Sequence, residues 1–197
     1  MSTKRPVRST FAVLAAAATL AACTTATPYQ PFRSHSVAGI HGGYSERRLA
    51  PDQYQVRFHG NSMTSRDRVE GYMLYRAAEL TLQSGYDWFL IVDRNTEHNV
   101  RTVVQPDPFY RPWYGPGYGY WQPEWRYYVQ GSGWNDWHGR MGSPFWADRM
   151  DIRRVEAFET TADIAMRKGA IPTREPRAID ARRVIADLGP SIERPKA

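Results

Sequence analysis

The sequence has little of what most catalytic and redox sites require. Cys23 is the only cysteine among 197 residues, which excludes an intramolecular disulfide, a CxxC redox pair and a multi-cysteine zinc site. The five histidines form no HxH or HExxH motif, and His59 lies on the solvent-facing parity of a predicted strand. A GxSxG elbow, a P-loop and a GxGxxG motif between a strand and a helix are also missing. We therefore expect no enzyme, no metal site and no cofactor.

The part of the chain after Cys23 has only a small excess of positive charge. Lysine and arginine total 26, against 20 acidic residues. Three of these cations, Lys4, Arg5 and Arg8, precede Cys23, which leaves 23 against 20 after it. Nucleic-acid binding usually needs a clustered basic face, and the arginines here are scattered among acids. We expect a solvated surface of mixed charge and no nucleic-acid partner.

Long hydrophobic runs are missing too. The most apolar stretch covers residues 11–22, FAVLAAAATLAA. A helix of that length spans about 18 Å, which is short of the ~30 Å hydrocarbon core of a bilayer. A basic start, a short apolar stretch and small residues before a cleavage site are typical of a secretory signal. We expect residues 1–22 to be a signal peptide.

The end of this stretch, Leu20-Ala21-Ala22-Cys23, resembles the lipobox of bacterial lipoproteins. In that class the signal peptidase recognises the residues that correspond to Leu20, Ala21 and Ala22, and the cysteine thiol receives a diacylglycerol. The new amine is then acylated, for example with palmitate, and two or three chains anchor the protein stably. The resemblance implies lipidation at Cys23, and the alternative is an ordinary signal peptide with a chance cysteine. An aspartate after the cysteine often retains lipoproteins in the inner membrane, so Thr24 favours the outer membrane, with the domain facing the periplasm.

The remaining chain divides by composition. Residues 23–50 are rich in Thr, Pro, Ser and Gly and predict a lipidated tether. Residues 51–190 predict a single α+β domain, and residues 191–197 a tail. Apolar periodicity places the elements of this domain: strands at 54–61, 86–98 and 151–167, and helices at 64–84 and 176–188. The order strand-helix-strand-insert-strand-helix predicts a small antiparallel sheet with helices on one face.

Four segments carry a resemblance to a family. They are Tyr54–Asn61, Tyr75–Leu82, Gly85–Phe89 and Ala186–Gly189. Together with the leader they resemble an uncharacterised family of alphaproteobacterial envelope lipoproteins of the Caulobacter type. The resemblance implies a compartment and a strand-helix-strand-strand core, and supplies no catalytic residues.

Acidic residues on the predicted strands have one catalytic interpretation. Glycoside hydrolysis needs two carboxylates that face one cleft, and the sequence does not place any pair in this way. We expect these acids to pair with arginines across strands instead. They are Asp87, Asp93, Glu97, Glu159 and Asp163.

The insert at residues 106–147 is the unusual part of the chain. It holds 14 of the 26 aromatic residues, with seven glycines and six prolines. Glycine and proline at this density exclude a helix, whereas twisted hairpins with Tyr and Trp pairs across strands are possible. The aromatics have three interpretations: a hairpin that covers the sheet, a recognition surface for sugar rings or a protein, or contact with the membrane interface. The candidate binding residues are Trp113, Trp121, Trp125, Trp134 and Trp137.

These observations lead to two functional hypotheses. The first is a membrane-anchored envelope lipoprotein with a non-enzymatic structural or protein-interaction role. The alternative is a lipoprotein that binds a glycan, peptidoglycan or lipopolysaccharide, through the aromatic insert. Both place the membrane among the partners through the N-terminal lipid.

Overall fold

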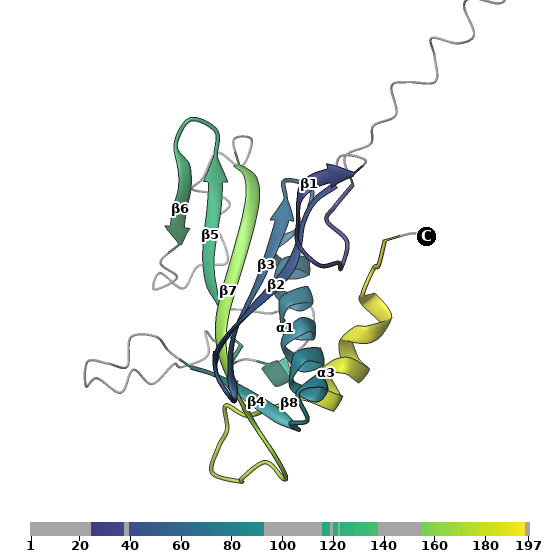
Figure 1. The fold of residues 1–197 in the computed structure, drawn as a ribbon, viewed down its shortest axis with the longest axis vertical. Helices are drawn as coiled ribbons and strands as arrows, with labels where there is room; N and C mark the ends of the chain where they lie inside the picture. The colour runs from purple at the N-terminus through teal and green to yellow at the C-terminus, as the bar shows by residue number, and fades with distance from the viewer. Residues whose placement is uncertain are drawn as a thin grey trace, which may run out of the picture.

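The computed structural model describes residues 25–37, 40–92, 116–118, 120–121, 123–137 and 155–195. Within these ranges the chain forms an antiparallel sheet and two α-helices (Figure 1). The strands are β1 (Arg33–Val37), β2 (Ile40–Ala50), β3 (Gln53–Asn61), β4 (Trp88–Ile91), β5 (Glu124–Val129), β6 (Gly133–Trp137), β7 (Val155–Arg167) and β8 (Ile179–Asp180). The α-helices are α1 (Arg66–Gln83) and α3 (Ala181–Leu188), and two 3₁₀ turns are η2 (Pro116–Tyr118) and η4 (Gly189–Ser191).

Strand β7 organises the sheet because both of its edges are paired. One edge pairs along its length with β3, from Asn61 opposite Ala157 to Gln53 opposite Ala165. The other edge is shared, since the first half of β7 pairs with β5 and the last residues pair with β4. Strand β6 pairs with β5, so the aromatic insert contributes a hairpin to the sheet.

Both helices begin at side-chain caps and lie on the same side of the sheet (Figure 1). Ser65 accepts a hydrogen bond from the Arg68 amide at 3.3 Å, and Asp180 accepts one from the Arg183 amide at 2.9 Å. Such caps satisfy amides that the first helical turn leaves without partners. The predicted α+β fold, an antiparallel sheet with helices on one face, is confirmed.

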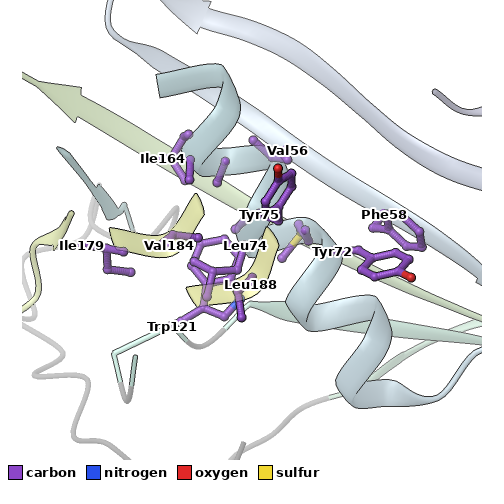
Figure 2. Close-up of a cluster of buried hydrophobic side chains, with 14 of the residues drawn as sticks. Val56, Phe58, Tyr72, Leu74, Tyr75, Trp121, Ile164, Ile179, Val184 and Leu188 are labelled. Atoms are coloured by element: carbon purple, nitrogen blue, oxygen red, sulfur yellow. The ribbon is translucent and has the colours of Figure 1, made fainter. Parts of the chain in front are cut away.

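The core lies between the helices and the sheet. Phe58 of β3, Met73 of α1 and Ile164 of β7 are fully buried there. Trp121 is 1% exposed and belongs to the same cluster as Leu188 of α3 (Figure 2). A residue of the insert therefore fills the core beneath the second helix.

The predicted tether is wrong for its described part. Residues 33–37 and 40–50 are strands β1 and β2, and β2 pairs with β3 over most of its length. Residues 25–32 are held as well, because Thr27 is fully buried and the Tyr29 amide donates to the Glu193 carbonyl at 2.8 Å. Composition indicated flexibility, but long-range hydrogen bonds fix this segment, so the domain begins before residue 51.

A close backbone approach makes this docking possible. Gly43 has φ of +125°, and a Cβ built on it would lie 2.3 Å from the Gln30 carbonyl oxygen. Only glycine fits both the backbone conformation and the space. Residues 27–32 can therefore lie against the start of β2, where the Phe32 amide donates to the Tyr44 carbonyl at 2.7 Å.

The other predicted elements differ mainly at their ends. The first strand and helix are confirmed as β3 and α1 to within two residues. Strand β4 confirms the start of the second strand, whereas residues 93–98 lie outside the described residues, as do residues 151–154 before β7. The last helix begins at Ala181 and not at Pro176, because Asp180 caps it and Ile179–Asp180 pair with β4.

Candidate interaction surface

The face of the sheet that turns away from the helices carries charged side chains. Strand residues alternate between the two faces, and in β3 Val56 and Phe58 are fully buried in the core. Arg57 and His59 therefore point to the opposite side, together with their cross-strand neighbours. We call this side the open face and define it by Arg57, His59, Arg126, Trp134 and Glu159.

Glu159 lies at the centre of the open face. The register places it opposite His59 of β3 on one side and Arg126 of β5 on the other. Its carboxylate oxygens lie 3.6 Å from His59 Nδ1, 3.7 Å from Arg57 Nε and 3.7 Å from an Arg126 terminal nitrogen. The side chain of Glu159 is only 9% exposed, so three basic groups enclose a buried carboxylate.

The surroundings keep this carboxylate charged. Burial by itself would raise the pKa of Glu159, because a carboxylate loses hydration. The hydrogen bond from His59 and the positive charges of Arg57 and Arg126 outweigh that effect, and the pKa lies below its ordinary value. Glu159 is therefore ionised at neutral pH. Its contacts with Arg57 and Arg126 confirm the prediction that this acid pairs with arginines across strands.

Aromatic rings continue the open face toward one end of the sheet. Phe32 contacts the His59 ring at 5.6 Å between centroids, His59 contacts Trp134 at 5.4 Å, and Trp134 contacts Tyr128 at 5.6 Å. The Arg126 guanidinium lies 5.3 Å from the centre of the Trp134 ring. Phe32 is 46% exposed, whereas Trp134 is half-buried. These contacts join the N-terminal segment to the hairpin of the insert.

The predicted binding tryptophans do not form one surface. Trp121 and Trp125 are buried in the core, and Trp125 Nε1 donates to Glu70 of α1 at 2.9 Å. These two residues are corrected from binding candidates to packing residues, because their rings have almost no accessible area. Trp134 is on the open face, and Trp137 lies in β6 opposite Trp125. Trp113 lies outside the described residues, as do Leu20, Ala21, Ala22 and Cys23.

Of the three predicted acids that are described, Asp87 and Glu159 lie too far apart to form a catalytic pair. Asp87 bonds Arg182 of α3 at 2.9 Å and accepts from the Gly169 amide. Its own amide donates to the Arg167 carbonyl, and Arg167 is eight residues, or about 26 Å of strand, from Glu159. The carboxylates of glycosidases lie within about 10 Å of each other. Asp163 accepts from Gln55 on β3, and Asp93 and Glu97 lie outside the described residues.

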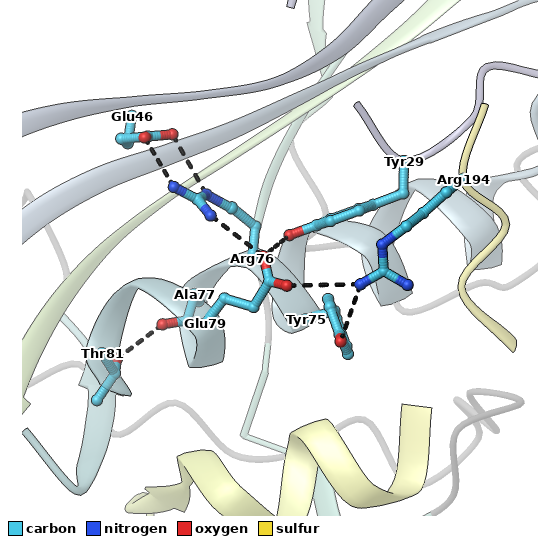
Figure 3. A network of polar contacts seen from close by, with 8 residues as sticks. All are labelled: Tyr29, Glu46, Tyr75, Arg76, Ala77, Glu79, Thr81 and Arg194. Carbon is cyan, nitrogen blue, oxygen red and sulfur yellow. Dashed lines mark hydrogen bonds and ion pairs between the residues drawn. The ribbon is translucent and has the colours of Figure 1, made fainter. Parts of the chain in front are cut away.

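A second polar cluster lies on the helix side, around Arg76 of α1 (Figure 3). Arg76 contacts both carboxylate oxygens of Glu46 on β2, at 2.9 and 3.4 Å, and bonds Glu79 at 3.1 Å. Tyr29 also donates to Glu79, and Arg194 lies 3.7 Å from the same carboxylate. Burial is the main cause that raises the pKa of Tyr29, and the hydrogen bond to Glu79 raises this pKa further. This cluster joins both ends of the domain to α1 and β2. The predicted tail at residues 191–197 is therefore wrong for Ile192, Glu193 and Arg194, which pack on the domain.

Sequence reasoning missed the assembly of the open face. Arg57 and Arg126 received no role, and His59 was assigned to the surface without a partner. The alternation in β3 signals that Arg57 and His59 share a face, but no local pattern reveals that Glu159 lies between them and Arg126.

Two further observations bear on membranes and metals. In the described ranges, no helix has both the length and the apolar character to span a bilayer. Within the same ranges, no three His, Cys, Asp or Glu side chains gather as ligands for a metal ion.

Comparison with known proteins gave no match to a family model, to a curated protein or to a solved structure.

Proposed function

We propose that this chain is a lipoprotein of the bacterial envelope, acylated at Cys23, that binds a protein partner on its open face without catalysing a reaction. The observation that carries the interaction is the group of Arg57, Arg126 and Glu159 on a sheet face that the helices leave uncovered. The lipobox Leu20-Ala21-Ala22-Cys23 supports the anchor. The compartment that we propose is the periplasmic side of the outer membrane.

The arginines of the open face suit a protein partner that carries carboxylates. The side chains of Arg57 and Arg126 are each 41% exposed. Both contact Glu159 at 3.7 Å, and Arg126 also pairs with Asp136 of β6 at 3.2 Å. A guanidinium has five donors in a planar fork, which matches a carboxylate of a partner. Arginine and aromatic residues are also enriched where interfaces gain most of their binding energy.

The state of Glu159 argues against a role as a general acid. A general acid at neutral pH needs a raised pKa so that it keeps a proton. Glu159 has the opposite shift, and its carboxylate is occupied by contacts with basic groups. Its position suits a residue that fixes two arginines in place for a partner.

Glycan binding receives less support. Sugar recognition by stacking needs an aromatic ring with an accessible face. Of the five proposed tryptophans, Trp121 and Trp125 are in the core, and the Arg126 guanidinium lies over the ring of Trp134. A purified peptidoglycan pull-down tests this alternative: no retention of the parent protein would remove it, and equal retention of the parent protein and Trp134→Ala would remove Trp134 as the sugar-binding ring.

The anchor is tested by a cysteine replacement in the native host. Cys23→Ser should abolish incorporation of an acyl label and leave an unprocessed precursor. Thr24→Ser is the matched control, because it leaves the four lipobox residues intact and should be labelled normally. A Cys23→Ser protein that is cleaved and released as a soluble product contradicts lipidation.

The partner is tested with a photo-crosslinking amino acid in the intact envelope. A crosslinker at position 57 should give a discrete protein adduct, and one at position 182 of α3, whose side chain is 68% exposed, should not. The adduct at 57 should disappear when Arg126→Glu reverses the neighbouring charge. An adduct that forms equally at 182, or that survives Arg126→Glu, overturns the assignment of the open face.

A further inference from the structure

The first described residues after Cys23 are already bound to the domain. The Asn61 side-chain amide donates to the Thr25 carbonyl at 2.7 Å. Thr27 is fully buried, and its backbone amide donates to the Thr64 hydroxyl at 2.8 Å. The Thr27 hydroxyl in turn accepts from the backbone amide of Asn61 at 3.0 Å. The chain is therefore fixed to the turn between β3 and α1 two residues after the cysteine.

This attachment leaves almost no slack between an acylated Cys23 and the domain. Two peptide units reach at most about 7 Å. The headgroup region of one leaflet is itself about 5–7 Å thick. If Cys23 is acylated, as the proposed function holds, the turn at Asn61–Thr64 lies at the level of the lipid headgroups.

We infer that the end of the sheet at this turn is a membrane-contact surface whose partner is the lipid bilayer itself. The register places four residues in one row across β3, β7, β5 and β6: Asn61, Ala157, Tyr128 and Trp134. The β3–α1 turn and the β5–β6 turn both project beyond this row, so they lie at the same end of the sheet. We call this end the anchor end.

The side chains at the anchor end suit an interfacial position. Met63, in the β3–α1 turn, is 58% exposed, the largest value among the exposed large hydrophobic side chains of the described residues. Phe32 is 46% exposed and connects through His59 to Trp134 and Tyr128. Tryptophan and tyrosine favour the headgroup level, where an apolar ring and a polar tip are both satisfied. Exposure of Met63 and Phe32 in water would be unfavourable, and bilayer contact removes that cost.

The opposite end of the domain provides an internal control. Ile171 is a large hydrophobic residue with 37% exposure. It follows Arg167 in β7, at the end of the sheet where Gln53 pairs with Ala165. Gln53 and Asn61 are eight strand residues apart, or about 26 Å. A surface that reaches the bilayer because of the anchor must therefore include Met63 and exclude Ile171.

The experiment uses the acylated full-length protein with one added cysteine. Acylation consumes the Cys23 thiol, so Met63→Cys and Ile171→Cys each provide a single free thiol for an environment-sensitive fluorophore. The proteins are reconstituted into vesicles of phosphatidylethanolamine and phosphatidylglycerol, with or without a headgroup spin label. We expect quenching at position 63 to be at least twice that at position 171. A label at Ser132, in the β5–β6 turn, should be quenched like the label at 63.

Mass spectrometry of the N-terminal peptide first shows whether the protein is acylated. In acylated protein, equal quenching at 63 and 171, or none at either, overturns the membrane-contact surface and leaves the anchor intact. An N-terminal peptide without acyl groups overturns the proposed function, and the membrane-contact surface with it. The two failures are therefore read from different measurements.

Discussion

Replacement of Arg76 by methionine should destabilise the domain strongly. Arg76 is 8% exposed, makes hydrogen bonds with Glu46 and Glu79, and lies 4.5 Å from the centre of the Tyr44 ring. Methionine fills similar space but leaves the Glu46 carboxylate without its cation and the Glu79 carboxylate with only Arg194 as its cation, at 3.7 Å. Removal of one partner from a buried ion pair costs about 3–5 kcal/mol. For a domain of this size, each kcal/mol lowers Tm by about 2–4 °C, so the expected loss is roughly 6–20 °C.

The assay is thermal unfolding followed by circular dichroism on the mature protein in detergent. Arg177→Met is the matched control, because the Arg177 side chain is 48% exposed and pairs with Glu175 at the surface. A surface pair of this kind contributes about 0–1 kcal/mol. Arg76→Lys keeps the charge but loses the contact with both Glu46 oxygens, and should fall between the two. If Arg76→Met and Arg177→Met lower Tm equally, the cluster does not hold the ends of the domain together.

Three further predictions follow from burial, charge and backbone conformation. Glu159→Gln should lower stability at pH 7 by about 1–3 kcal/mol. Because the pKa of Glu159 is lowered in the folded state, its contribution to stability is complete above about pH 4.5 and is lost as pH falls through the folded pKa. The difference in unfolding free energy between parent and variant should therefore close in acid. A difference that stays constant in urea unfolding at each pH would contradict this. Trp121→Ala should cost about 3–5 kcal/mol in urea unfolding, since the ring is 1% exposed, and a loss below about 1 kcal/mol would place the ring outside the core. Gly85→Ala should lower the free energy of unfolding by about 1–2 kcal/mol from its positive φ alone. Gly43→Ala should lower it clearly more, because its Cβ also meets the Gln30 carbonyl. Equal losses of stability in the two variants would refute the close approach at Gly43.

The elements that the sequence predicts well are those with strong local signals. Strand β3 alternates apolar and polar residues, and α1 has a capping serine and a terminating glycine. The predicted start of the last helix, at Pro176, is too early. Proline is common as the first residue of a helix, but here Asp180 supplies the cap of α3. Local chemistry thus identifies an element more securely than its boundary.

The predicted tether fails for a reason that no local pattern reveals. Thr, Ser, Gly and Pro in residues 24–50 have the composition of a linker. The partners that fix them are distant in sequence, since Thr27 contacts Thr64 and Tyr29 contacts Glu79 and Glu193. Tertiary hydrogen bonds and burial of Tyr29 override the composition.

The open face combines a predictable part with an unpredictable one. Parity along β3 places Arg57 and His59 on the same side, and the acids of the last strand were expected to pair with arginines. The register between β3 and β7 joins residues about a hundred positions apart, and β5 comes from an insert without apolar periodicity. The identity of the partners of Glu159 therefore depends on long-range pairing.

A short connection to Cys23 would also determine how the open face is presented. Strands β3 and β5 both run toward the anchor end, because each is antiparallel to β7. A bilayer at that end meets the strands at their tips, so the open face stands beside the membrane and remains accessible to a periplasmic protein. Arg57 is four residues, or about 13 Å, from Asn61, which is beyond a headgroup layer of about 5–7 Å. A crosslinker at 57 should therefore capture protein while a probe at 63 senses lipid. Headgroup quenching of a probe at 57 as strong as at 63 would show that the open face lies flat on the bilayer, and a protein partner could not then occupy it.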